Sequence, residues 1–162
     1  MHLKQIIRAP KNNINIGTWR NGKVERKDFP IAKKAYRLGK SFDWCVIAFQ
    51  AMSADCRVLV VMNIQKQKYE AILGVMGQRG ILHILCSYEY HPSEPGWHAH
   101  ATHDEVSTVS SGIMRGPWIM RVPGARKPHR TAKHSNFNFD DRKAALHFAI
   151  DRYNIVEKGP LL

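Results

Sequence analysis

The sequence from Ile81 to Thr102 reads ILHILCSYEYHPSEPGWHAHAT and contains the clearest strand pattern of the chain. Its first ten residues, 81–90, are rich in aliphatic and aromatic side chains, which favours a strand. Residues 91–96 (HPSEPG) contain two prolines and a glycine, and this composition predicts a loop. Residues 97–102 (WHAHAT) alternate in character and can pair back on the first strand. The sequence therefore predicts an antiparallel hairpin.

Further segments extend this hairpin into a sheet. Residues 43–52 and 57–64 are aliphatic runs that predict buried strands. Residues 68–76 fit either a strand or a helix, but the glycines at Gly74 and in the following residues 77–80 favour a strand that ends in a turn. Residues 113–122 predict an edge strand, because a proline interrupts them.

Two helices are expected, one near each end of the chain. Pro30 precedes IAKKAYRLGK, residues 31–40, and proline is favoured in the first turn of a helix. Asn138 can cap a second helix that ends at about Tyr153. The predicted fold class is α+β, with an antiparallel sheet of about five strands and a helix near each end. We expect one domain over residues 1–162, with a basic segment at about 1–28 and a basic loop at about 123–136.

The charge of the chain points to an anionic partner. The 162 residues include 25 Lys and Arg against 13 Asp and Glu, a formal net charge of +12. Residues 1–40 alone carry 11 basic and 2 acidic residues, a net charge of +9. Aromatic residues lie among the basic ones, as Trp19, Tyr36 and Trp118 do. Because cations release counterions from phosphates and aromatic rings stack on unpaired bases, nucleic acid is the expected partner.

Hydrophobic runs and cysteines exclude several other classes of protein. The longest aliphatic run, Val58 to Met62, is too short to span a bilayer. The N-terminal residues 1–10 lack the apolar core of a signal peptide, so secretion is not expected. The three cysteines are odd in number and lack CxxC spacing, which indicates neither a disulfide framework nor a zinc ribbon. We therefore expect a reduced, cytoplasmic setting without membrane contact.

Histidines and acids gather at residues 96–105, GWHAHATHDE. On a strand, His98 and His100 point to the same face, with the alanines on the other. Two imidazoles so placed can bind one divalent metal ion, whose identity the pattern leaves open. Asp104 is the expected third ligand, and His103 or Glu105 the expected general base. Other histidines can join this site only through the fold: His83, His91, His129 and His134.

The pair His98-Ala99-His100 after Gly96-Trp97 resembles the His-hydrophobic-His motif of HUH endonucleases, the rolling-circle replication initiators and relaxases. In that family the pair lies on a central antiparallel strand and a tyrosine on a downstream helix attacks the phosphate. The resemblance covers about ten residues and the strand before them, and it implies Tyr153 as the nucleophile. The polar residues after His100 depart from the family pattern.

A second resemblance is to JAMM metalloproteases, which also use a His-x-His pair followed by a serine and an aspartate. At the matching places this chain has Thr108 and Ser111. The missing aspartate removes a metal ligand, so this resemblance ranks below the first.

The leading hypothesis is a metal-dependent nuclease that acts on DNA or RNA. His98, His100 and Asp104 would hold the metal, while His103, Glu105 and Tyr153 would serve in catalysis. Three alternatives stay open: a non-enzymatic nucleic-acid-binding protein with structural histidines, a metal-free histidine ribonuclease, and a JAMM-like metallohydrolase. The residues expected to contact the nucleic-acid backbone are Arg115, Arg121, Arg126, Lys127, Arg130 and Lys133.

Overall fold

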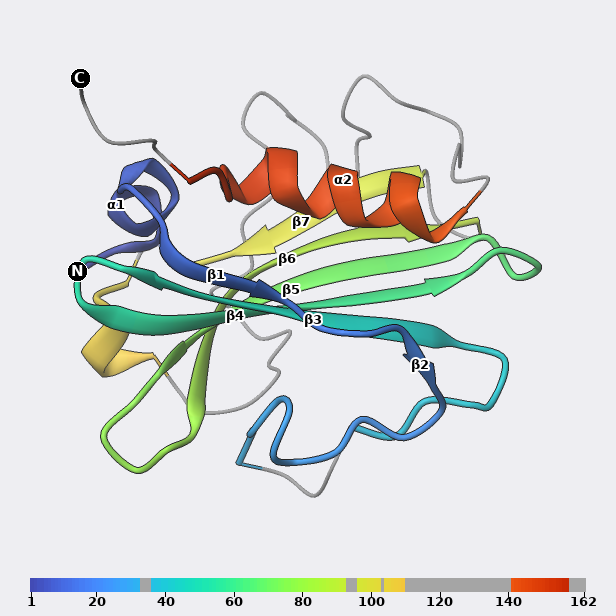
Figure 1. Cartoon of the computed structure of the whole chain (residues 1–162), viewed down its shortest axis with the longest axis horizontal. Coiled ribbons are helices and arrows are strands. Elements are labelled where there is room, and N and C mark those ends of the chain that lie inside the picture. Colours follow the sequence, from blue (N-terminus) through green and yellow to red (C-terminus); the bar gives the residue numbers. More distant parts are fainter. Residues whose placement is uncertain (33–35, 93–95, 103, 110–140, 158–162) are drawn as a thin grey trace.

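The structure is a computed structural model that describes residues 1–32, 36–92, 96–102, 104–109 and 141–157 (Figure 1). Within these ranges the chain is α+β, as the sequence predicts. The elements are α1 (Leu3–Arg8), β1 (Asn12–Ile16), β2 (Arg20–Asn21), β3 (Asp43–Ala51), β4 (Ala54–Asn63), β5 (Lys68–Met76), β6 (Leu82–His91), β7 (Gly96–Ala101), the 3-10 turn η1 (Val106–Thr108) and α2 (Arg142–Tyr153).

One seven-stranded sheet forms the centre of the described part, in the order β1-β3-β4-β5-β6-β7, with β2 also pairing with β3. All strand pairs are antiparallel, and β3 to β7 follow one another as a meander. The prediction of about five strands is too low, because β1 has five residues and β2 has two, and neither contains an aliphatic run like those of the longer strands. Both of them pair along the outer edge of β3.

The predicted strands of the meander are confirmed. The ambiguous segment 68–76 is the strand β5, and the 81–102 hairpin forms as β6 and β7. β4 begins three residues earlier than predicted, at Ala54, because Met52 and Ser53 both adopt positive φ angles of 51° and 63°. This conformation makes the two-residue turn that joins β3 to β4. The predicted edge strand 113–122 lies outside the described residues.

The helix near the N-terminus does not lie where the sequence predicts it. The described residues of the segment 30–40 form no helix, and the helix of this half is α1, at Leu3–Arg8. Ile31 is 3% exposed because it packs against the sheet, so the apolar positions of this segment anchor a covering loop. Lys11 stabilises α1 by donating to the carbonyl groups of Ile6, Ile7 and Ala9 at 2.7–2.9 Å.

The helix near the C-terminus is confirmed and ends at Tyr153 as predicted. Its N-cap is Asp141, whose side chain accepts a hydrogen bond from the backbone N–H of Ala144. The predicted cap Asn138 lies outside the described residues. The helix ends where Asn154 turns to the left-handed conformation at φ 51°. Among the described residues, neither α1 nor α2 has the length and hydrophobicity of a membrane-spanning helix.

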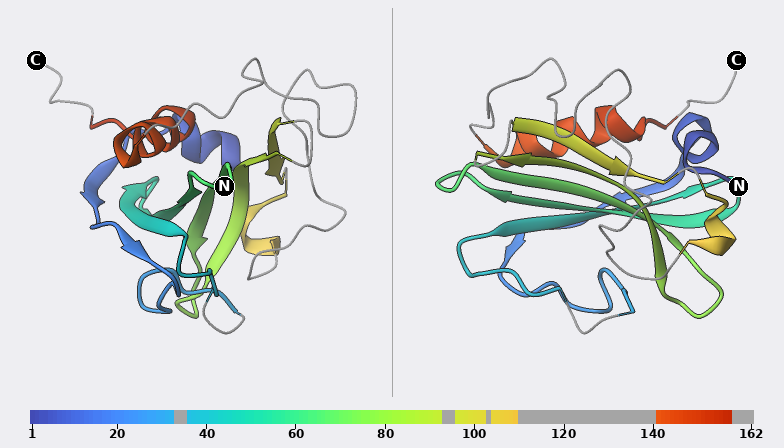
Figure 2. Two further views of the ribbon diagram at one scale, coloured as in Figure 1. Left: turned by 90° about the vertical axis from the view of Figure 1, so that its right-hand side faces the viewer. Right: turned by 180° about the vertical axis from the view of Figure 1, so that it is seen from behind.

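The two faces of the sheet are covered by different segments (Figure 2). Helix α2 covers one face, where Ala145, Ala149 and Tyr153 are fully buried against the strands. On the other face, Val24, Phe29 and Ile31 of the segment between β2 and β3 pack onto the strands. This second core is smaller than the core between the sheet and α2.

The three cysteines are free and lie inside the molecule. Burial raises the pKa of Cys45 to about 11 and the pKa values of Cys56 and Cys86 to about 12. Because the thiolate is the reactive form, none of the three should react with iodoacetamide at pH 8 in the folded protein. All three should react in guanidinium chloride, as counted by mass spectrometry. Rapid labelling of a native thiol would contradict this placement.

Candidate metal centre

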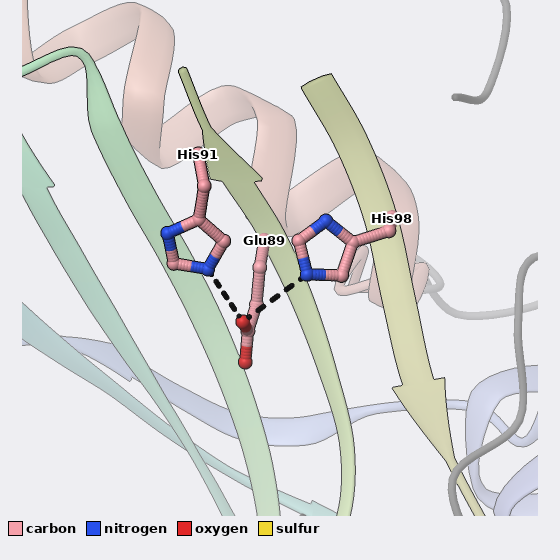
Figure 3. A group of neighbouring side chains, drawn as sticks. All are labelled: Glu89, His91 and His98. Carbon is pink, nitrogen blue, oxygen red and sulfur yellow. Dashed lines mark hydrogen bonds and ion pairs between the residues drawn. The ribbon is translucent and has the colours of Figure 1, made fainter. Parts of the chain in front are cut away.

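The hairpin of β6 and β7 presents alternate side chains to opposite faces of the sheet. Trp97 stacks on Phe148 of α2, with 4.5 Å between ring centroids, and Tyr88 contacts Tyr153 edge to face. Their neighbours Glu89 and His98 therefore point away from α2. Figure 3 shows Glu89, His91 and His98 in front of the strands, with α2 behind them.

The strand register brings these side chains together. Glu89 lies directly opposite His98, and Ser87 lies opposite His100. His91 follows Glu89 by two residues and so projects from the same face of β6. The result is three imidazoles grouped around one carboxylate, drawn from two neighbouring strands.

All three imidazoles approach a single oxygen, Oε2 of Glu89. The Nε2 atom of His91 lies 2.8 Å from this oxygen, that of His98 3.4 Å and that of His100 3.7 Å. The other carboxylate oxygen, Oε1, accepts a hydrogen bond of 2.9 Å from the hydroxyl of Ser87. Ser87 therefore fixes the orientation of the carboxylate toward the histidines.

Most side chains of the cluster are buried. Glu89 is 2% exposed, His98 is 4% exposed and His100 is 9% exposed. The side chain of His91 is 18% exposed, so it forms the most accessible side of the cluster. A buried carboxylate is costly unless positive charge or hydrogen bonds compensate it, and the imidazoles and Ser87 provide such partners.

Glu89, His91 and His98 could hold a metal ion, because their ligand atoms all lie within 4.8 Å of one another. Two ligand atoms bound to one ion at about 2.0–2.2 Å lie about 2.8–3.6 Å apart in octahedral or tetrahedral geometry. The distances to Glu89 Oε2 fall close to this range. Ligand sets rich in imidazole suit Zn²⁺, Fe²⁺, Ni²⁺ or Cu²⁺, whereas Mg²⁺ and Ca²⁺ prefer oxygen ligands.

Of the three predicted metal ligands, the two histidines lie at the cluster and the aspartate does not. His98 belongs to the cluster and His100 lies beside it, on the shared face that the alternation predicts. Asp104 is exposed. Among the described residues, it does not belong to the group that could hold a metal ion, which is Glu89, His91 and His98. Its backbone N–H donates to the hydroxyl of Thr102.

Neither of the two predicted catalytic residues that the structure describes, Glu105 and Tyr153, is brought to the cluster. Glu105 pairs with the N-terminal amine of Met1 and with His2, whose Nε2 is 3.0 Å away. The hydrogen bond from that amine lowers the pKa of Glu105 below its usual value. His103 lies outside the described residues.

Tyr153 lies on the other side of the sheet from the histidines. It is fully buried, and its hydroxyl donates to the carbonyl groups of Ala71 at 2.6 Å and Cys86 at 3.3 Å. Burial raises the pKa of this hydroxyl well above its usual value. The structure therefore does not bring Tyr153 into the site as the HUH resemblance implies.

Sequence reasoning missed Glu89 and left His91 undecided. The signal for Glu89 was present: it is the single carboxylate of this strand, near the strand's end and two residues from a histidine. The residues expected to contact phosphates lie outside the described residues: Arg115, Arg121, Arg126, Lys127, Arg130 and Lys133.

Searches of protein-family models, curated proteins and solved structures found no match to this chain.

Proposed function

We propose that this protein is a metal-dependent hydrolase of phosphodiester bonds in nucleic acid. Glu89, His91 and His98 hold one divalent transition-metal ion, and His100 completes the ligand set. The observation that carries this proposal is the approach of three imidazole nitrogens to one carboxylate oxygen at 2.8–3.7 Å. Such an ion, when bound, polarises a phosphate ester and lowers the pKa of water.

The position of the basic residues between Arg20 and Lys40 supports an anionic substrate. Apolar side chains of residues 24–31 and 36–42 pack on the face of the sheet to which the histidines point, away from α2. The described basic side chains between Arg20 and Lys40 are exposed: Arg20, Lys23, Arg26, Lys27, Arg37 and Lys40. Positive charge beside a partly buried metal centre attracts a polyanion and raises its local concentration.

The nuclease proposal is tested by cleavage of labelled single-stranded DNA and RNA. We expect cleavage that stops with EDTA, returns with Zn²⁺ or Mn²⁺, and falls at least about 100-fold in His98→Ala, because the ion stabilises the developing charge. His147→Ala is the matched control, because His147 is an exposed histidine on α2, on the opposite side of the sheet. Metal content is measured on the same samples.

The remaining outcomes separate the alternatives. Cleavage that survives EDTA but requires His98 would favour metal-free acid–base catalysis by the histidines. Salt-sensitive binding of nucleic acid without cleavage would favour a binding protein with structural histidines. Either result contradicts the proposal of a metal-dependent nuclease.

A further inference from the structure

A pocket of about 230 Å³ opens on the same face of the sheet, directly beside His91. Its walls combine apolar side chains with one cation and one carboxylate: Leu38, Phe42, Val61, Lys68, Glu70 and His91. Pockets for drug-sized ligands measure about 300–1,000 Å³, so this one fits a single small ring system. Because His91 belongs to both, the pocket adjoins the candidate metal centre.

The strand register ties the pocket to the cluster. Val61 of β4 lies opposite Glu70 of β5, Glu70 lies opposite Glu89 of β6, and Glu89 lies opposite His98 of β7. These four residues form one row across the face. The Cβ atoms of directly opposed residues lie about 4.5–5.5 Å apart. Glu70 is therefore one strand away from the metal-ligating carboxylate.

Glu70 is held in a defined position. The hydroxyl of Tyr36 donates to its Oε2 at 2.8 Å, and Tyr36 is itself fixed by its backbone carbonyl, which accepts from the N–H of Val24. A carboxylate fixed among apolar walls favours ligands that offer N–H donors and rejects those that lack them. Lys68 stands exposed at the rim, where it can meet a phosphate.

We propose that this pocket binds the base of one nucleotide and that Glu70 reads the donors on its edge. The preferred base is guanine, because its adjacent N1–H and exocyclic amino group match a carboxylate. The phosphate of the nucleotide then lies between Lys68 and the metal centre. This inference rests on the proposed function, since it names the substrate contact next to the proposed metal.

The test compares guanosine, inosine and uridine monophosphates by isothermal titration calorimetry on the protein with and without added Zn²⁺. The three share the phosphate, so any difference in affinity reports the base alone. Inosine lacks only the exocyclic amino group of guanosine. We expect guanosine monophosphate to bind about 5- to 150-fold more tightly than inosine monophosphate, the range for one well-made base contact.

Two variants assign the preference to Glu70. Glu70→Gln should reduce the guanosine-to-inosine ratio to near one while the zinc content stays unchanged. Tyr36→Phe should reduce it partly, because the carboxylate loses its positioning donor. Glu157→Gln is the control, since Glu157 is an exposed glutamate that follows α2. Circular dichroism confirms that each variant is folded.

Each outcome either supports or overturns the proposed base pocket. Equal affinities for the three nucleotides, or an unchanged ratio in Glu70→Gln, overturn the base pocket even where zinc is bound. A guanosine preference that needs Glu70 supports the pocket, and if zinc binding fails in the same protein, only the metal function falls. Short oligonucleotides with a single guanosine or inosine show whether the preferred nucleotide is free or part of a strand.

Discussion

Glu89→Gln is expected to lower the affinity for Zn²⁺ at least about 100-fold, because partners that only support metal ligands already cost about 10–100-fold. The amide keeps the size of the side chain and can still accept from Ser87, but it removes the negative charge that all three imidazoles approach. Titration with a competing chelator measures the affinity. Thermal unfolding monitors the fold of the metal-free variant.

Asp104→Asn is the control that separates the two assignments of the carboxylate ligand. The sequence pattern favours Asp104, whereas the structure places Glu89 at the centre of the cluster and Asp104 at the surface. We therefore expect unchanged zinc affinity in Asp104→Asn. If Asp104→Asn loses zinc and Glu89→Gln retains it, the cluster described above is not the metal site.

Tyr153→Ala is expected to lower the free energy of unfolding by about 3–5 kcal/mol, the usual cost of removing a large buried aromatic side chain. Tyr153→Phe should cost about 1–3 kcal/mol, because two buried carbonyl groups lose a hydrogen bond. Domains of this size are stable by only about 5–15 kcal/mol, so the alanine variant should be close to unfolding. Urea denaturation followed by circular dichroism measures both values.

The phenylalanine variant also tests the role that the HUH resemblance implies for Tyr153. A nucleophilic tyrosine would leave a covalent protein–nucleic acid adduct, and Tyr153→Phe would abolish both the adduct and cleavage. We expect no adduct in the unmodified protein, and unchanged zinc affinity and cleavage in Tyr153→Phe. An adduct that disappears in this variant would contradict the buried, hydrogen-bonded position of the hydroxyl.

Local patterns were sufficient for most of the sheet. The strands of the meander and the final helix each carry their signal within about ten residues, as aliphatic runs, alternation or a capping residue. The prediction of a helix in segment 30–40 was wrong. The apolar spacing of this segment suits a helix, but the side chain of Ile31 anchors a loop on the sheet instead. The strands β1 and β2, with five and two residues, are too short to carry a comparable signal, and they pair with the outer edge of β3.

Local patterns are enough to predict that the chain is α+β, that a hairpin spans residues 81–102, and that His98 and His100 share one face, because alternation along a strand is a local property. Which carboxylate meets the histidines depends instead on how the strands pair. Glu89 and His98 are nine residues apart in the chain, and the antiparallel register places them opposite each other. The same packing placed Tyr153 under the other face, because α2 covers that side of the sheet and buries its apolar stripe there.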